Sequence, residues 1–254
     1  MMDYNKMNEI IKRVDGHRKM PDFEDEYNRR VNRSVRGIDT HSLIKTMAEL
    51  ICYSQNARAQ QVTDMIDKGY LDMAFNNFNQ SGIADLNSQG IIDKYWKYLS
   101  PIRFKNKVQR IIDCCEIISD GFPIVDLIEK FPGQIRNMND INLFWKNFRE
   151  LQDSMKNVKM PFYQSSTTLL HLLMMLGFDC IKPDTIVMRV AIEELGIVGS
   201  EKRENDRIGV VRDIQDYSVN NKIKPSIVDF YLLIEGGQTW ARKFVDNEFK
   251  SVFY

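Results

Sequence analysis

The sequence predicts an all-α protein, and three observations indicate this class. Apolar residues recur at spacings of three and four, most clearly in 43–54 and 108–115, and this spacing places them on one face of a helix. Turn signals such as Ser100-Pro101 and Lys182-Pro183 separate segments of helical length. We find no convincing run of alternating strand residues and no repeat at a fixed period.

The composition is that of a soluble globular protein, with 43% hydrophobic and 28% charged residues in 254. The longest apolar run, 169–178, is broken by His171 and is shorter than the roughly 18 residues that cross a bilayer. The first residues lack the apolar core of a secretion signal. We therefore expect a cytoplasmic protein with no membrane partner.

The four cysteines show no metal-ligand spacing, so we expect reduced core thiols and no metal. Thirty-five basic and 35 acidic residues cancel. This balance counts against a nucleic-acid binder that relies on net charge, although a local basic face remains compatible with it.

The most informative segment runs from Ile181 to Val190, directly after the apolar run. Asp184 follows Pro183 at the start of an expected helix, and Arg189 comes one and a half turns later. A simple helix cap explains this carboxylate. The pattern Asp-Thr-x-x-x-Arg-Val also resembles the catalytic segment of the helix-hairpin-helix DNA glycosylases, the superfamily of endonuclease III. The resemblance implies that Asp184 is the catalytic carboxylate at the junction of two helical lobes.

Leu43 to Val62 resembles the first core helix of that superfamily and the polar turn after it. In the family, a Gln at this turn enters the duplex and fills the space of an extruded nucleotide. The resemblance assigns this wedge to Gln55, with Asn56 as the next candidate. A solvated helix end is the alternative.

The segment 98–108 resembles the turn that leads into an amphipathic helix of the family. The resemblance, together with the charges, implies a basic face for DNA phosphates and aromatic surfaces for a flipped base. A solvated helix face and ordinary core aromatics are the alternatives. The implied basic face comprises Arg103, Lys105, Lys107 and Arg189, and the implied base pocket comprises Trp96, Tyr98 and Phe104.

Met160 to Thr168 is similar to the family's hairpin, in which two glycines open backbone amides to a phosphate. Phe162 and Gln164 replace both glycines. Ser166 fills the column of a lysine, and Asp184 lies 18 positions after it, as in the family. The resemblance assigns phosphate binding to Pro161, Tyr163, Gln164, Ser165, Ser166 and Thr167.

The stretch 231–240 resembles the one that opens the iron–sulfur loop of endonuclease III. Trp240 stands where the first cluster cysteine would be, and no cysteine follows. Since a cluster needs four thiolates, we expect no iron–sulfur cluster and no other cofactor.

The resemblance implies a two-lobed fold. We expect a six-helix bundle with a degenerate hairpin over 42–180, and a second lobe made of 1–41 plus 181–254. An additional helix is expected near 139–152. The implied activity is excision of a damaged or mismatched base from double-stranded DNA by a monomeric enzyme. The sequence does not identify that base.

Ser166 has no amine, so we expect a monofunctional glycosylase. Three alternatives stay open. The first is a bifunctional lyase that uses Lys159 or Lys182. The second is a non-catalytic DNA-binding or interaction protein of the same fold. The third is an unrelated helical protein in which Asp184 is only a cap.

Overall fold

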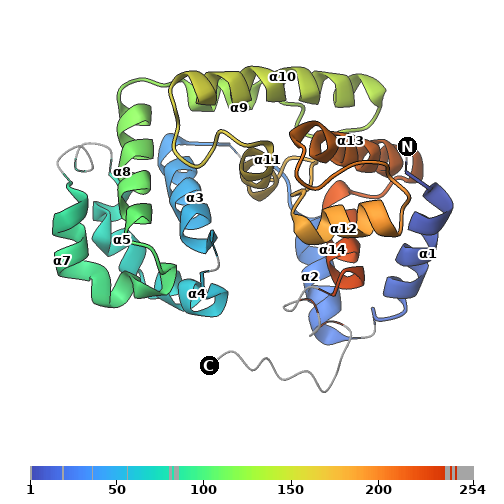
Figure 1. The fold of residues 1–254 in the computed structure, drawn as a ribbon, viewed down its shortest axis with the longest axis horizontal. Helices are drawn as coiled ribbons and strands as arrows, with labels where there is room; N and C mark the ends of the chain where they lie inside the picture. Colours follow the sequence, from blue (N-terminus) through green and yellow to red (C-terminus); the bar gives the residue numbers. More distant parts are fainter. Residues whose placement is uncertain are drawn as a thin grey trace. The chain divides into compact units, whose positions relative to one another are not determined.

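A computed structural model of the chain describes residues 2–18, 20–35, 37–55, 57–79, 82, 86–237, 241 and 244. These residues form helices joined by turns and contain no strand, so the all-α prediction is confirmed (Figure 1). The chain divides into two compact units. The first comprises Met1–Arg36, Phe131–Phe148 and Ser165–Tyr254, and the second comprises Gly37–Lys130 and Arg149–Gln164.

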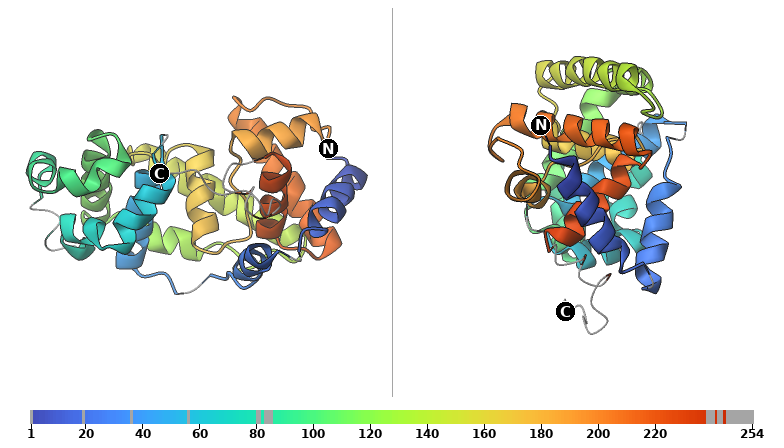
Figure 2. Two further views of the ribbon diagram at one scale, coloured as in Figure 1. Left: turned by 90° about the horizontal axis from the view of Figure 1, so that it is seen from below. Right: turned by 90° about the vertical axis from the view of Figure 1, so that its right-hand side faces the viewer.

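The first unit is built around α14, which packs against α1, α2, α12 and α13 (Figures 1 and 2). Nearly every residue of α14 from Pro225 to Leu233 is buried, as expected for a helix that is apolar on all sides. The helices of this unit are α1 (Tyr4–Asp15), α2 (Pro21–Val31), the first part of α10 (Met138–Asn157), α11 (Ser166–Met175), α12 (Thr185–Glu193), α13 (Glu204–Asn221) and α14 (Pro225–Glu235). No helix in the described ranges is both long and apolar enough to cross a membrane.

A buried polar chain crosses the core of the first unit. The indole Nε1 of Trp145 donates to Oε1 of Gln215 at 2.7 Å, and the Gln215 amide donates to the carbonyl of Asp179 at 2.8 Å. The Asp179 carboxylate accepts from the backbone N–H of Ile135 at 2.9 Å. Because a buried polar group without a partner lowers stability, this series of hydrogen bonds fixes α10 and α13 against the turn that precedes α12.

In the second unit α3 packs against α8. The predicted faces are buried: Leu43, Met47 and Ile51 on α3, and Val108 and Ile111 on α8. The elements of this unit are α3 (Thr40–Tyr53), α4 (Ala59–Asp67), α5 (Tyr70–Ala74), η1 (Asn76–Phe78), α7 (Ser88–Leu99), η2 (Ser100–Ile102), α8 (Asn106–Ser119), α9 (Ile124–Glu129) and the end of α10.

The helix predicted near 139–152 is α10, and the division between the units falls within it. Phe144 near its start makes ring contacts with Phe131 at 5.1 Å, and Phe131 contacts Phe178 at 5.5 Å. These aromatic contacts join the first half of α10 to the first unit. The units therefore differ in their bounds from the expected lobes, because 131–148 and 165–180 fall with the terminal segments instead of with 42–130.

Candidate functional site

Asp184 is the N-cap of α12. Its Oδ1 accepts hydrogen bonds from the backbone N–H groups of Ile186 at 3.0 Å and Val187 at 3.1 Å. The side chain is half-buried, and its second oxygen has no hydrogen-bond partner among the described residues. One carboxylate oxygen therefore stabilises the helix while the other remains available to a ligand.

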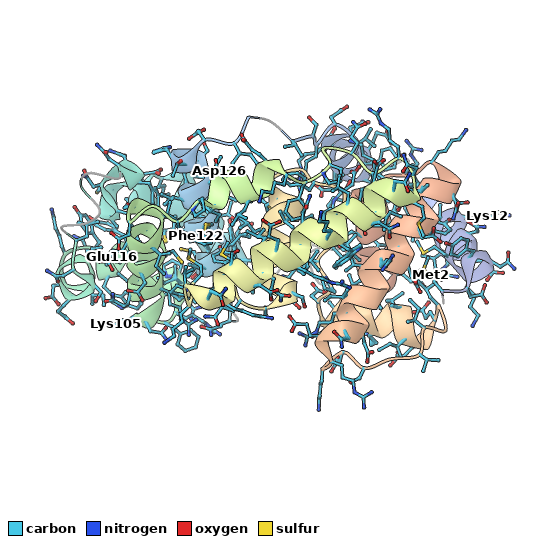
Figure 3. All side chains as sticks on the ribbon, turned by 90° about the horizontal axis from the view of Figure 1, so that it is seen from above. Met2, Lys12, Lys105, Glu116, Phe122 and Asp126 are labelled. Carbon is cyan, nitrogen blue, oxygen red and sulfur yellow. The ribbon has the colours of Figure 1, made fainter. Side chains whose placement is uncertain are left out.

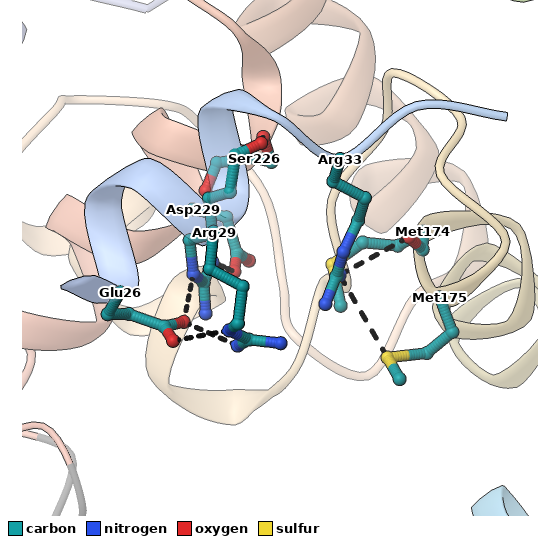
Figure 4. Close-up of polar contacts among 8 residues, drawn as sticks. Glu26, Arg29, Arg33, Met174, Met175, Ser226 and Asp229 are labelled. Carbon is teal, nitrogen blue, oxygen red and sulfur yellow. Dashed lines mark hydrogen bonds and ion pairs between the residues drawn. The ribbon is translucent and has the colours of Figure 1, made fainter.

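A buried ion pair lies within electrostatic reach of Asp184. Nη1 of Arg30 donates to Oδ2 of Asp229 at 2.8 Å, and the Arg30 Nε donates to Glu26 at 2.6 Å (Figure 4). Burial raises the pKa of Asp229, Arg30 opposes this, and the charge of Asp184 raises the pKa further. The other oxygen of Asp229 is buried and unpaired among the described residues. The charge of Asp184 thus acts on a buried, hydrogen-bonded ion pair.

Arg189 ties α12 to the end of α14. Its Nη2 donates to the carbonyl of Gly236, although the side chain itself is exposed. A Cβ at position 236 would lie 2.3 Å from the Ile186 methyl, so only glycine allows this approach. Arg189 therefore has a structural partner in this protein, and its proposed contact with DNA remains a prediction.

The N-terminus of α11 already carries an anionic group. Ser165 is the N-cap and accepts from the backbone N–H of Thr168 at 3.3 Å. The backbone N–H of Ser166 donates to Oε1 of Glu204 at 2.9 Å. The side-chain hydroxyls of Ser166 and Thr167 are buried and have no hydrogen-bond partner among the described residues. A carboxylate thus occupies the amide at which the resemblance implies a phosphate.

The rest of the predicted hairpin belongs to the second unit, where it is fastened to α3 and α8. Tyr163 is fully buried and donates its hydroxyl to the carbonyl of Met47 at 2.6 Å. The thiol of Cys114 lies 3.5 Å from the carbonyl of Pro161. The exposed Gln164 donates its amide to the carbonyl of Met160 at 3.1 Å. Tyr163 is therefore a core residue. Of the predicted phosphate-binding residues in this unit, Pro161 and Gln164 have accessible side chains.

Phe162 carries a backbone conformation that favours glycine. Its φ is +70°, and the N–H of Tyr163 donates to the carbonyl of Pro161 at 2.9 Å across it. A bulky residue seldom adopts a positive φ, and doing so costs about 1–3 kcal/mol. Phe162, which the resemblance matches to the first hairpin glycine, thus has a backbone conformation that favours glycine.

The predicted wedge lies at the end of α3. Gln55 is exposed and has a φ of +52°, whereas Asn56 lies outside the described residues. The ammonium of Lys107 donates to the carbonyls of Cys52 at 3.1 Å and Ser54 at 2.6 Å. Lys107 is fully buried, so it holds the turn before Gln55 and does not belong to the exposed basic face.

Three of the predicted residues share one pocket of about 540 Å³ in the second unit. Trp96 and Phe104 form its aromatic part, and none of the described residues that line it is acidic. Lys105, labelled in Figure 3, places its ammonium 5.5 Å from the centre of the Trp96 ring. The pocket is lined by Arg58, Gln61, Trp96, Ser100, Pro101, Arg103 and Phe104. Aromatic surface beside unpaired positive charge suits a planar, anionic ligand such as a nucleotide.

Arg103, which lines this pocket, has a strained backbone conformation. Its φ is +71°, and the N–H of Phe104 donates to the carbonyl of Ile102 at 3.0 Å, which closes a γ-turn. Turns of this hand are rare, and strained residues cluster at ligand sites. Tyr98 is not part of this pocket, because it stacks on Tyr70 at 4.4 Å.

Arg58 and Gln61 also line this pocket, and neither was predicted from the sequence. Arg58 is the last residue of the polar segment 54–58, and this polarity is the feature of the sequence that could have indicated a binding role for Arg58. Trp240 lies outside the described residues. Within the described ranges, no three His, Cys, Asp or Glu side chains are grouped so that they could hold a metal ion.

Comparison of the chain with protein-family models, with curated proteins and with solved structures finds no match.

Proposed function

We propose that this protein is a DNA glycosylase that excises a damaged or mismatched base from duplex DNA. The observation that carries the proposal is Asp184. It is a half-buried carboxylate with one oxygen bound to helix amides and the other unpartnered among the described residues. It follows Ser166 by 18 positions and begins α12, as the resemblance requires of the catalytic residue.

Cleavage of an N-glycosidic bond develops positive charge on the sugar, as in glycoside hydrolysis. A fixed carboxylate stabilises that charge and can orient a water molecule for attack. The two N–H groups that hold Asp184 fix its orientation before substrate arrives. In this proposal Asp184 therefore acts mainly through electrostatic stabilisation.

An enzyme that reacts with a base in a duplex must extrude the nucleotide and fill the gap. Gln55 is the proposed wedge because it is exposed on a turn with a positive φ, held from inside by Lys107. The pocket of Trp96, Phe104 and Arg103 supports a nucleic-acid ligand, since it combines stacking surface with unneutralised charge.

The second candidate is a helical DNA-binding or interaction protein without catalysis. Glu204 at the N-terminus of α11 favours it, since this carboxylate blocks a phosphate from the hairpin amide. Capping alone would also account for the presence of Asp184.

Asp184→Asn separates these two functions, because Asn caps a helix about as well as Asp but carries no charge. The assay is base release from a panel of duplexes, each with one lesion or mismatch. We expect the variant to keep the wild-type melting temperature and DNA affinity while excision falls by orders of magnitude. Asp184→Ala serves as the capping control and should lower stability by about 1 kcal/mol. Full activity of Asp184→Asn on a confirmed substrate would remove the assigned role, and no excision by the wild type across the panel would favour the second candidate.

A further inference from the structure

Three arginines close α2 in the first unit. Arg29 and Arg30 lie in its last turn, and just beyond the helix the N–H of Arg33 donates to the carbonyl of Arg30 at 3.3 Å. Arg33 lies two residues after the end of α2, whereas Arg29 lies within the helix. In Figure 4 their two side chains leave the α2 segment in the same direction.

Two of these arginines have acidic partners. Arg29 donates two hydrogen bonds to Glu26, both at 2.7 Å. Arg30 is shared between Glu26 and the buried Asp229. Glu26 and Asp229 act on Arg33 through their charges, but within the described residues neither forms a hydrogen bond or ion pair with it.

Arg33 is different. Within the described residues, its side chain makes a long hydrogen bond from Nη1 to the carbonyl of Met174 at 3.4 Å and a contact with the Met175 sulfur at 4.0 Å (Figure 4). A guanidinium has five N–H donors, so most of those on Arg33 have no oxygen partner among the described residues. Burial lowers the pKa of Arg33, the charges of Arg29 and Arg30 lower it further, and the charges of Glu26 and Asp229 partly oppose this. Arg33 is therefore a half-buried cation with no hydrogen-bonded anion among the described residues.

Lys182 and His171 add donors to this region. Lys182 is half-buried, and its ammonium forms no hydrogen bond or ion pair within the described residues, although its carbonyl accepts from the N–H of Asp184 at 2.8 Å. Burial lowers the pKa of His171 to about 3, and the charges of Lys182 and Arg33 contribute. His171 is therefore neutral at pH 7 and brings an N–H donor without a further charge. The ammonium of Lys224 is also near, because it donates to the carbonyl of Arg33 at 2.9 Å.

The backbone holds Arg33 against the segment that leads to Asp184. Gly177 has a φ of +98°, and a Cβ there would lie 2.6 Å from the carbonyl carbon and oxygen of Ser34. The segment after α2 thus rests directly on the turn after α11. That turn continues through Lys182 to Asp184, and the charge of each acts on Asp229.

We propose that Arg33 and Lys182, flanked by Arg29, form a binding site for a backbone phosphate of DNA beside Asp184. A guanidinium fork matches the oxygens of a phosphate, and a lysine adds a point charge. This site supplies a phosphate contact that the Glu204-occupied start of α11 does not. It rests on the proposed function for the identity of the ligand, whereas the unsatisfied donors do not depend on it.

The test is binding of an undamaged DNA duplex, measured by fluorescence anisotropy over a range of salt concentrations. Each phosphate contact contributes a slope of about −0.9 to log K against log salt, which corresponds to about five-fold in affinity at 0.15 M. We expect Arg33→Gln and Lys182→Gln each to weaken binding about five-fold and to reduce the slope by about one. Lys12→Gln is the matched control, since Lys12 is an exposed lysine on α1 of the same unit (Figure 3). It should leave both quantities unchanged.

Unchanged slopes in both variants, with melting temperatures close to wild type, would overturn the site. A second measurement is thermal stabilisation by inorganic pyrophosphate. Stabilisation that depends on Arg33 while DNA binding does not would assign a small-anion site and overturn the choice of DNA. Arg33→Lys keeps the charge but loses the fork, so an intermediate affinity is expected. Undamaged DNA requires no catalysis, so failed base release would remove the proposed enzyme while leaving this result intact.

Discussion

Lys107 is buried in the second unit, and its ammonium donates hydrogen bonds to the carbonyls of Cys52 and Ser54. Burial, above all, lowers its pKa from 10.5 to about 8. A neutral amine still has two N–H donors for two carbonyls. The hydrogen bonds can therefore survive loss of the proton, and only the cost of burying the charge is removed.

This shift predicts a specific pH dependence of stability. Between pH 8 and pH 10.5 the unfolded chain keeps a proton on Lys107 that the folded protein has released, so the free energy of unfolding rises with pH in this window. Lys107→Met lacks this contribution. We expect the wild type to gain up to about 3 kcal/mol relative to the variant between pH 7 and 10.5, measured by guanidinium unfolding. A difference that stays constant across that range would contradict the buried-ammonium description.

The burial of Lys107 could have been predicted from its spacing in the sequence, although a charged residue is usually expected at the surface. Position 107 precedes Ile111 by four and Cys114 by seven, so the helical period places it on the apolar face of α8. The resemblance and the positive charge of Lys107 instead predicted that it belongs to the basic face. Arg103 and Lys105 are exposed, as that prediction requires.

Elements with a strong local signal were predicted well. The faces of α3 and α8 follow from apolar spacing, and the start of α12 follows from Pro183 and Asp184. The contact between Glu204 and Ser166 joins residues 38 apart and has no periodic signature. Long-range polar contacts of this kind need the tertiary structure.

The hairpin element offers a direct test of backbone strain at Phe162. Phe162→Gly and Phe162→Ala both remove the ring contact with Tyr163 at 5.0 Å, so their difference reports the positive φ together with the greater entropy of glycine in the unfolded chain. We expect the Gly variant to be more stable than the Ala variant by about 1 kcal/mol, from chemical or thermal unfolding. Gln164 is the matched control, since its φ is not positive. There Gly should be less stable than Ala by about 0.5–1 kcal/mol. The same order at both positions would argue against the strain.

At the scale of the molecule, composition and periodicity were sufficient for the helical class but not for the division of the chain. The expected boundary near 180 follows the order of motifs along the sequence. In the observed first unit, Phe131 instead contacts both Phe144 and Phe178. The pocket of Arg58, Trp96 and Arg103 has the same origin, since it draws on separate elements that only folding brings together.

The proposed function predicts which product the whole enzyme forms. A lyase needs an amine to form an imine with the sugar, whereas Ser166 offers a buried hydroxyl. We therefore expect an intact strand with an abasic site, which breaks only after hot alkali. The measurement is gel analysis of the product, together with borohydride trapping on abasic DNA.

Two lysines are the alternatives that this experiment must exclude. Lys159 is exposed and has a φ of +52°, whereas Lys182 is half-buried next to Pro183. A covalent adduct that disappears in Lys159→Ala or Lys182→Ala would make the enzyme bifunctional. The Lys182 result also bears on the phosphate site, because a lysine that binds phosphate should change DNA affinity without forming an adduct. Base release without any trapped complex would leave Asp184 as the group that stabilises the developing charge and water as the nucleophile.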